Sequence, residues 1–504
     1  MIMIDAIMGK CKRSQGELLM TKHPIITKSN TVPELYRDIF PPQPDPTREF
    51  ILKRCTYKEV YRLAAGIRQL QSQREESRTL ICLCTDNKAL IAAAIIASLA
   101  EGPHIVLPYA FSRQAVKEVF EILSPSLILT DQPVDFPPGP EVITPPMLRC
   151  DHIIPDIFHD PDEPFLLLFT GGSTGKPKVW PKTPRNILAE ARYLAGKFSI
   201  TPDDLFLSTA PPQHIYGLLF SVMIPFISSS RVLDGVYSFP REILRAIQDH
   251  RASILVSVPV HYRVLKVDDL QRHNLRMAFS SAGALDKEDA AYFHSKTGLD
   301  IIEIYGSTET GGVASRSRST DGESWRSLDP VVWKIQEGRL HVRSSFISPT
   351  LPRNADGFFA TADRADYEGD ERFILRGRAD NIVKIGGKRV DLSAVQAKLK
   401  QIPGVRDALV VAIPTGKGTQ NKLAALVATD LDELQLRRDI ALVSESYAVP
   451  KRIVVVEEIP MTSSGKSDRT VIERILLSGR QNADSSMVPV RGDSMSRKSL
   501  KLWK

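Results

Sequence analysis

The sequence from Phe165 to Lys182, FLLLFTGGSTGKPKVWPK, joins an apolar run to a glycine-rich loop. The run Phe165–Phe169 predicts a short buried strand. Three glycines in the loop let the backbone approach a ligand closely and turn its N–H groups toward one point, an arrangement that binds phosphate oxygens. Hydroxyl and amino groups add donors to the same loop: Thr170, Ser173, Thr174, Lys176 and Lys178. A solvated glycine-rich turn has the same composition, so distant segments must decide between the two interpretations.

A P-loop nucleoside triphosphatase is one alternative for this loop. Its motif is G-x-x-x-x-G-K-[ST], but here Thr170 stands at the first glycine and Pro177 follows Lys176, where Ser or Thr would hold magnesium. The loop instead resembles the phosphate loop of the adenylate-forming superfamily, [ST]-[SG]-G-[ST]-T-G-x-P-K. That superfamily includes acyl-CoA synthetases, aryl-CoA ligases, adenylation domains and luciferases. The resemblance implies that ATP phosphates are bound by Thr170, Gly171, Gly172, Ser173, Thr174, Gly175 and Lys178.

A second match to this superfamily lies at residues 305–309, which read YGSTE and fit the pattern Y-G-x-T-E at every specified position. Tyr305 offers an aromatic face on which adenine can stack, and Glu309 offers a hard oxygen ligand for Mg²⁺. The resemblance implies that the Thr308 hydroxyl contacts the α-phosphate. Four specified residues at fixed spacing, downstream of a phosphate loop, make this match specific.

Two weaker matches are expected at strand-to-helix junctions. Residues 211–218 contain the P-x-x-H-x-x-G-L element of the superfamily. The resemblance implies that His214 orients the substrate carboxylate, although a lone histidine is more often structural. Residues 277–284 form a predicted strand that ends in small side chains, and Gly283 and Ala284 are implied to line the adenine. A tight strand-to-helix turn would explain the glycine equally well.

The carboxylate that would hold the ribose comes later in the chain. Residues 356–363 resemble D-G-[WF]-x-x-T-G-D, with Ala362 in place of the second glycine. The resemblance implies that Asp363 accepts hydrogen bonds from both ribose hydroxyls, an arrangement that suits a carboxylate because it has two acceptor oxygens.

Two C-terminal motifs complete the resemblance. Residues 373–389 match the element G-R-x-D-[DN]-x-[IV]-K-x-x-G, and residues 460–469 match P-x-T-x-[ST]-G-K-x-x-R. The first implies that Arg378 contacts ribose or phosphate and that Asp380 is the hinge to a small domain. It also implies that Gly386 and Gly387 form the thiol-tunnel loop. The second motif implies that Lys466 is the catalytic lysine, which bridges the carboxylate and the α-phosphate.

Chain length and patterning predict more than one domain, because 504 residues are too many for a single hydrophobic core. Strands alternate with helices between residues 79 and 129, which predicts βαβ units and a parallel sheet. Residues 131–163, rich in Pro and Asp, predict a surface connection that leads to the phosphate loop. The resemblance implies an α/β fold in which parallel and mixed sheets pack with helices, plus a small mobile α+β domain. The expected divisions are a weakly ordered segment 1–30, an AMP-binding domain 31–379, a lid domain 380–477 and a disordered basic tail 478–504.

The net charge of +7 is concentrated at the termini and argues against a nucleic-acid partner. Residues 478–504 hold six Lys and Arg against two Asp, and residues 1–24 hold four basic against two acidic side chains. The five cysteines lack metal-ligand spacing and predict reduced thiols in a cytoplasmic protein, with Cys82 and Cys84 on one face of a strand. Apolar runs are too short for a membrane span.

Together the motifs, from about Thr56 to Leu477, imply ATP-dependent activation of a small carboxylic acid. The expected reaction forms an acyl- or aryl-adenylate with release of pyrophosphate, and then transfers the acyl group to coenzyme A or to the phosphopantetheine of an acyl carrier protein. ATP and Mg²⁺ are the other cofactors, and the loop sequence favours aryl or medium-chain acids. Amino-acid adenylation is one alternative. A catalytically silent, regulatory nucleotide-binding relative is another, motivated by Ala362, but retention of Glu309, Asp363 and Lys466 argues against it.

Overall fold

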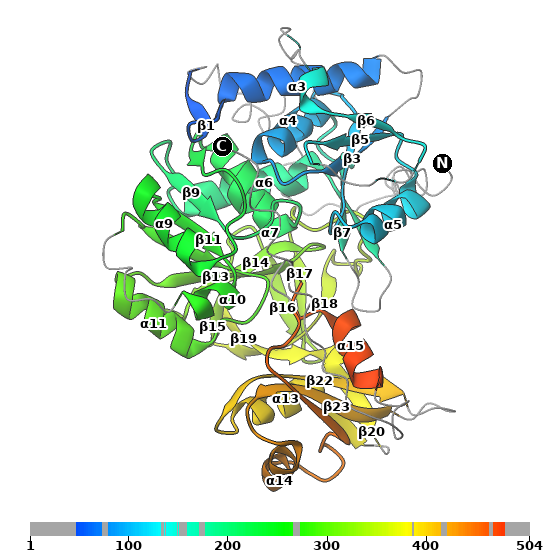
Figure 1. The fold of residues 1–504 in the computed structure, drawn as a ribbon, viewed down its shortest axis with the longest axis vertical. Helices are drawn as coiled ribbons and strands as arrows, with labels where there is room; N and C mark the ends of the chain where they lie inside the picture. Colours follow the sequence, from blue (N-terminus) through cyan, green and yellow to red (C-terminus); the bar gives the residue numbers. More distant parts are fainter. Residues whose placement is uncertain are drawn as a thin grey trace, which may run out of the picture. The chain divides into compact units, whose positions relative to one another are not determined.

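The computed structural model describes residues 47–72, 79–132, 136, 138–148, 150, 159–170, 177–265, 273–385, 388–414, 421–462 and 467–478. The chain divides into two compact units, with the main boundary between Asn381 and Ile382 (Figure 1). Met461 and Thr462 group with the large unit. The large unit contains two sheets and most of the helices. The small unit contains a three-stranded sheet, a two-stranded sheet and three helices.

The first sheet of the large unit has six strands, in the order β6 (Glu141–Ile143), β5 (Leu127–Thr130), β3 (Leu80–Cys84), β4 (His104–Leu107), β7 (Leu166–Thr170) and β8 (Lys178–Lys182). All neighbouring strands are parallel except β7 and β8. Helix α4 (Lys88–Leu99) connects β3 to β4, and α5 (Arg113–Leu123) connects β4 to β5. The βαβ units predicted from the alternating pattern are therefore confirmed.

The segment predicted to be a surface connection, residues 131–163, includes a short strand. Glu141–Ile143 forms β6, which pairs in parallel with β5, and Pro145–Leu148 forms the 3₁₀ turn η2. Three residues with only one buried side chain, Ile143, give too little periodicity for a strand to be read from the sequence. The prediction for the two cysteines of β3 is confirmed, because both are buried with their sulfur atoms 3.8 Å apart.

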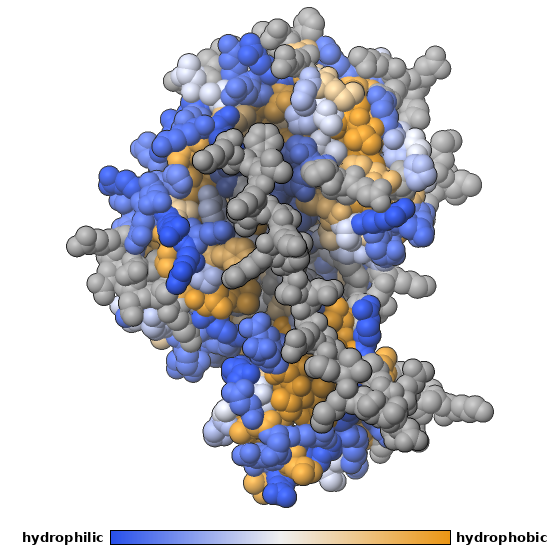
Figure 2. Space-filling model, viewed as in Figure 1, coloured by the Kyte–Doolittle hydropathy of each residue, from blue (hydrophilic) through white to orange (hydrophobic). Residues whose placement is uncertain are grey.

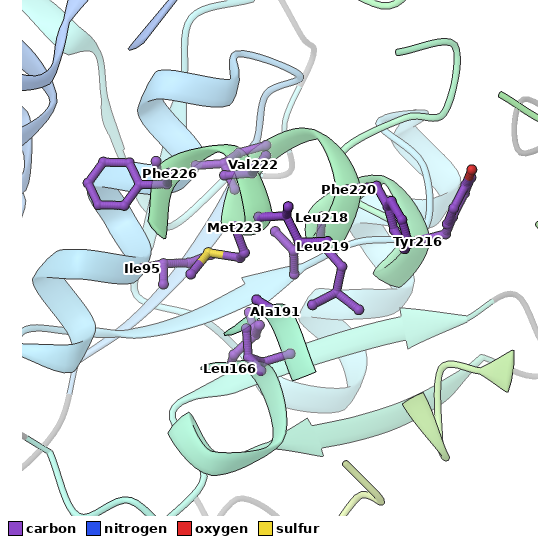
Figure 3. Packing of buried hydrophobic residues seen from close by; sticks show 14 of the residues in the cluster. Ile95, Leu166, Ala191, Tyr216, Leu218, Leu219, Phe220, Val222, Met223 and Phe226 are labelled. Atoms are coloured by element: carbon purple, nitrogen blue, oxygen red, sulfur yellow. The ribbon is translucent and has the colours of Figure 1, made fainter. Parts of the chain in front are cut away.

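Successive side chains of this sheet point alternately to its two faces. Ile81, Leu83 and Leu166 belong to the core cluster that contains α4, whereas Leu80 and Cys82 pack with α5. Every residue of α4 is buried, as expected for a helix that is apolar all round. Figure 3 shows one side of this packing: Ile95 of α4 points toward Met223, and Leu166 lies beside Ala191.

The second sheet has thirteen strands and changes from parallel to antiparallel at β13. Six neighbouring strands are parallel to one another, in the order β1, β10, β9, β11, β12 and β13. The remaining neighbouring pairs are antiparallel. In sheet order the strands are β16 (Val332–Gln336), β17 (Arg339–Arg343), β18 (Phe359–Glu368), β19 (Arg372–Arg378), β15 (Ser324–Ser327), β14 (Gly311–Ser317), β13 (Ile301–Ser307), β12 (Met277–Ser280), β11 (Ile254–Ser257), β9 (Leu205–Ser208), β10 (Arg231–Val232), β1 (Glu49–Ile51) and β2 (Cys55–Thr56).

The other helices of the large unit fill and cover the space around the two sheets (Figure 1). They are α3 (Tyr57–Ser72), α6 (Pro184–Lys197), α7 (Ile215–Leu218), the π-helical turn η3 (Leu219–Met223), α8 (Ile224–Ile227), α9 (Pro240–His250), α10 (Pro259–Val264), α11 (Lys287–Thr297), α12 (Arg318–Asp321) and the 3₁₀ turn η5 (Ala379–Asn381). Helix α6 has the most complete start: Thr183 and Asn186 form a capping box, and Pro184 occupies its first turn.

The small unit is an α+β domain with its own core. Strands β22 (Val405–Pro414) and β23 (Asn421–Thr429) are antiparallel, and β24 (Arg452–Val456) runs parallel to β23. Helices α13 (Leu392–Lys400) and α14 (Glu433–Val443) pack on one face of this sheet and α15 (Arg469–Ser478) on the other, while β20 (Ile382–Ile385) pairs with β21 (Lys388–Asp391). Apolar side chains remain exposed on α14, including Leu442, and Figure 2 shows apolar atoms in this part of the molecule.

Candidate active site

Several of the predicted nucleotide residues of the large unit lie at or near the carboxyl ends of neighbouring strands of the thirteen-stranded sheet. Strands β9, β11, β12 and β13 are parallel, so their carboxyl ends meet at one edge. His214 follows β9, Gly283 and Ala284 follow β12, and Tyr305 lies near the end of β13. Ligands of α/β sheets bind at this kind of edge. The topology therefore brings together segments that are far apart in the sequence.

Tyr305, Asp363 and Arg378 form a connected cluster. The Tyr305 hydroxyl donates a hydrogen bond to Asp363 Oδ2 at 2.6 Å. Asp363 on β18 is paired in register with Arg378 on β19, whose Nη1 lies 3.9 Å from Asp363 Oδ1. Burial, together with the negative charge of Asp363, raises the pKa of Tyr305 well above its usual value, so the phenol remains a hydrogen-bond donor. The cluster holds a carboxylate in a fixed orientation beside an aromatic ring and a guanidinium group.

The ring of Tyr305 is held in place by two neighbouring aromatic side chains. Its centroid lies 5.5 Å from that of Trp325 and 6.3 Å from that of Phe373. The first of these neighbours comes from β15 and the second from β19. Because the two strands pack against the ring, its orientation is set by the fold, as adenine stacking would require.

The turn between β13 and β14 presents Thr308 and Glu309. The Ser307 and Thr310 hydroxyl groups lie 2.9 Å apart, and each side chain also accepts a hydrogen bond from the other residue's main-chain N–H. The Glu309 carbonyl accepts a hydrogen bond from the Ser348 N–H at 2.8 Å. Thr308 and Glu309 are half-buried. The turn is therefore closed by its own side chains, and it offers a hydroxyl group and a carboxylate next to Tyr305.

Two buried charged side chains that the motifs did not indicate, Lys182 and Glu190, hold the segments next to this turn. Lys182, at the end of β8, and Glu190, on α6, are almost inaccessible to solvent. Burial lowers the pKa of Lys182, and the carboxylates of Glu190 and Glu309 oppose that shift. Burial also raises the pKa of Glu190, against the effects of Lys182 and of the Gly312 N–H. A signal was present in the sequence, because Glu190 falls three residues after the apolar Ile187, on the face of α6 that packs inward.

His214 begins the short helix α7, and its surroundings explain the glycine of its motif. It is half-buried, and its main-chain N–H donates to the carbonyl of Pro211 at 3.2 Å. A Cβ atom added at Gly217 would lie 2.0 Å from the same Pro211 carbonyl oxygen. Glycine is therefore required where α7 packs directly against the main chain of Pro211. The role predicted for its side chain stays a prediction.

The turn after β12 does not need its glycine for steric reasons. The residue with a left-handed backbone is Ala282, with φ 71°, and Gly283 has no such strain. A Cβ atom at Gly283 would meet only Pro259 Cγ, at 3.6 Å, which is an ordinary contact. Gly283 and Ala284 are both exposed. A tight turn therefore does not account for this glycine, and the close approach of a flat ligand stays a prediction.

Several predicted residues lie outside the described part of the chain. They are Gly171, Gly172, Ser173, Thr174, Gly175, Gly386, Gly387 and Lys466. The two ends of the phosphate loop are described: Thr170 and Lys178 are directly paired between β7 and β8, and the Trp180 indole donates to the Thr170 hydroxyl at 3.2 Å. The loop therefore leaves and re-enters the sheet at adjacent positions.

The donor set suits magnesium held together with phosphates. Within the described ranges, no group of three or more His, Cys, Asp or Glu side chains could hold a metal ion. Mg²⁺ commonly takes one or two carboxylates, several waters and substrate phosphate oxygens in place of a full protein cage. Glu309 on its own turn fits that pattern, in which most ligands come from the nucleotide and water.

Comparison with known proteins supports the same interpretation. Residues 50–343 match the family model described as AMP-binding enzyme, and residues 394–466 match the model of the AMP-binding enzyme C-terminal domain. The chain belongs to the AMP-binding enzyme family. The α/β fold and the adenylate-forming resemblance predicted from the motifs are thereby confirmed.

Relatives of this AMP-binding enzyme include two bacterial CoA ligases. It is 26% identical to the sulfoacetate–CoA ligase of Cupriavidus necator over 338 residues, which are 61% of this chain and 66% of that protein. It is 26% identical to the medium-chain fatty-acid–CoA ligase of Escherichia coli over 350 residues, which are 63% and 62% of the two chains. The matched segments thus span less than two thirds of these relatives.

Solved structures share the fold over most of the chain. ATP-bound MatB from Rhodopseudomonas palustris superimposes with a TM-score of 0.75 and 19% identity, covering 88% of this chain and 98% of that one. The O-succinylbenzoate CoA synthetase MenE of Bacillus subtilis, in complex with AMP, gives a TM-score of 0.71 at 19% identity, covering 85% and 93%. No helix in the described part of the AMP-binding enzyme combines the length and apolar character needed to cross a membrane.

Proposed function

We propose that this AMP-binding enzyme is an AMP-forming acid–thiol ligase. It would activate a small carboxylic acid with Mg·ATP, release pyrophosphate and transfer the acyl group from AMP to a thiol. The observation that carries this proposal is the cluster of Tyr305, Asp363 and Arg378, joined by the 2.6 Å hydrogen bond and next to the Glu309 turn. A stacking face, a ribose carboxylate and a magnesium ligand at one sheet edge suit a nucleotide that is cleaved at its α-phosphate.

The residues of the large unit have distinct proposed roles in the first half-reaction. Asp363 would bind both ribose hydroxyls, and Arg378 would contact ribose or phosphate. Thr308 would donate to the α-phosphate, while His214 would orient the attacking carboxylate. Magnesium bound with Glu309 would supply positive charge to the phosphates. Adenine would lie against Tyr305 and pass over the exposed, sterically open turn at Gly283 and Ala284.

The phosphate loop and the C-terminal elements would complete the reaction. The loop from Thr170 to Lys178 would hold the β- and γ-phosphates through backbone N–H groups. Lys466 would bridge the carboxylate and the α-phosphate, where charge spreads in the transition state. Asp380 would act as the hinge, and Gly386 and Gly387 would line the thiol path in the second half-reaction. The unit boundary found between Asn381 and Ile382 lies directly after the proposed hinge.

The acid and the thiol are the finer parts of the proposal. We favour an aryl or medium-chain acid and coenzyme A, since the relatives above are CoA ligases. An acyl carrier protein is the other possible thiol donor. Amino-acid adenylation is not favoured, because the relatives are named for other acids.

Pyrophosphate release measured over a panel of acids tests the proposal. Sulfoacetate, medium-chain fatty acids, aryl acids and amino acids would be offered with Mg·ATP, and each active acid would then be tested with coenzyme A and with a phosphopantetheinylated carrier protein. We expect release with one acid class and consumption of its adenylate by coenzyme A. ATP binding without pyrophosphate release from any acid would instead support the silent, regulatory alternative.

A further inference from the structure

We propose that Lys182 and Glu190 are positioning residues that fix the Ser307–Gly312 turn, and with it the Glu309 carboxylate, relative to the strand that leaves the phosphate loop. The inference rests on the proposed function, because it assigns these residues to Mg·ATP binding. Neither residue is expected to touch the nucleotide. Each acts through the backbone of a neighbouring segment.

Lys182 connects the turn to β8 through residues 346–348. Its side chain is 0% exposed, and Nζ donates to the Phe346 carbonyl at 3.2 Å. Two residues later, the Ser348 hydroxyl donates to the Pro181 carbonyl at 2.8 Å, and the Ser348 N–H donates to the Glu309 carbonyl at 2.8 Å. A continuous chain of hydrogen bonds therefore runs from β8, which follows the phosphate loop, to the backbone of Glu309.

Glu190 holds the other end of the same turn. Its Oε1 accepts a hydrogen bond from the Gly312 N–H at 2.6 Å, and the side chain is 2% exposed. A Cβ atom at Gly311 would lie 2.5 Å from Glu190 Oε2, and one at Gly312 would lie 3.0 Å from Oε1. Gly311 also has φ +69°, a left-handed conformation that favours glycine. The two glycines let the turn backbone lie directly on the carboxylate.

Stability alone gives a poor reason for burying these charges. A buried charged group costs free energy unless it is paired and fully hydrogen-bonded, and Glu190 Oε2 has no hydrogen-bond partner among the described residues. Burial lowers the pKa of Lys182, and the carboxylates of Glu190 and Glu309 both oppose that shift, so the ammonium group lies within electrostatic reach of both. Glu190 reaches the turn directly at Gly312, and Lys182 reaches it through residues 346–348. These two contacts are suited to set the place of the Glu309 carboxylate.

The test uses variants that remove the charges without leaving one of them unpaired in the core. In Lys182→Met/Glu190→Gln the amide oxygen can still accept from Gly312, whereas in Lys182→Met/Glu190→Leu that acceptor is lost as well. The control is Lys88→Met, because Lys88 is also almost fully buried but donates instead to the Leu233 and Gly235 carbonyls. The affinity for ATP is measured by calorimetry, with and without Mg²⁺, beside the melting temperature.

We expect both double variants to bind Mg·ATP more weakly. The Glu190→Gln version should melt near the wild-type temperature, and the Glu190→Leu version somewhat lower, because its buried Gly312 N–H loses an acceptor. Loss of a group that orients a metal ligand typically weakens metal binding by about 10- to 100-fold, and the Glu190→Leu version should show the larger loss. Binding of metal-free ATP should change less than about 2-fold, and the control should keep the wild-type ratio of the two affinities. A double variant with normal melting and unchanged Mg·ATP affinity would overturn the inference. Wild-type protein that binds no Mg·ATP would instead overturn the proposed function.

Discussion

Asp363→Asn is the most direct test of the nucleotide site. Asparagine keeps the shape of the side chain and one carbonyl oxygen, which can still accept the hydrogen bond that Tyr305 donates at 2.6 Å. It removes the negative charge facing Arg378 and replaces the second oxygen by an NH₂ donor. The substitution therefore leaves the fold of β18 and β19 nearly unchanged while removing half of the acceptor capacity proposed for the ribose.

The expected loss of affinity follows from the two ribose hydroxyls. A hydrogen bond to a charged acceptor contributes about 1.5–3 kcal/mol, and a neutral one about 0.5–1.5 kcal/mol. Weakening both bonds should therefore cost about 2–3 kcal/mol in binding. Because each 1.4 kcal/mol is a factor of ten, the dissociation constant for ATP should rise about 30- to 150-fold. The Arg378–Asp363 separation of 3.9 Å is long for a strong ion pair, so stability should change little.

The matched control is Asp366→Asn, on the same strand. Asp366 pairs with Arg376 of β19 at 2.7 Å, and both side chains are more than half exposed. Exposed ion pairs contribute about 0–1 kcal/mol, so this variant should bind ATP like the wild type and melt at nearly the same temperature. Calorimetric titration with ATP measures both variants. Equal ATP affinity in Asp363→Asn and Asp366→Asn would refute the assignment of Asp363 to the ribose.

Four further predictions concern single positions. Glu309→Gln should raise the magnesium concentration needed for half-maximal pyrophosphate release, and an unchanged magnesium titration would remove Glu309 from the metal site. Lys466→Ala should slow adenylate formation about 10²- to 10³-fold while ATP binding is retained, as calorimetry can establish. Asp380→Pro should preserve adenylate formation but block thioester formation from supplied acyl-AMP, because proline fixes φ; equal loss of both steps would contradict a hinge there. Burial lowers the pKa of Lys88 from 10.5 to about 8, so the unfolded state binds more protons between these values. Unfolding free energy should therefore rise from pH 8 to 10 by up to about 1.4 kcal/mol per pH unit relative to Lys88→Met, and parallel urea-unfolding curves would contradict this.

The sequence motifs predicted Tyr305, Asp363 and Arg378 as site residues, because the superfamily pattern specifies residue types at positions that are far apart in the chain. Tyr305 and Asp363 are 58 positions apart and joined by a side-chain hydrogen bond. Hydrophobic periodicity alone would not predict this contact. It indicates which face of a helix or strand is buried, but not which other element packs against that face. The parallel strands could be predicted because apolar runs bounded by polar turns are a local property of the sequence.

Lys182 and Glu190 were not predicted as site residues, because their burial depends on segments that are distant in the sequence. In the sequence, Lys182 is the last residue of a strand and Glu190 is one of several polar residues on an amphipathic helix. Such positions are usually solvated. Only the placement of β14 and residues 346–348 over them makes them buried. The short strand β6 was missed for a similar reason, because its pairing with β5 decides its structure.

Helix α4 has a consequence for how the protein is made. Every residue of this helix is buried, yet part of its cover, Met223 of η3, is synthesised more than a hundred residues later (Figure 3). At roughly 5–20 residues per second, the ribosome needs on the order of 10 s to supply that cover. During this interval α4 can pack on α3 and on the nearby strands, but the apolar surface that η3 covers stays exposed. Chains halted before η3 should therefore need a chaperone to remain in solution, and the large unit should acquire protease resistance only after η3 has emerged.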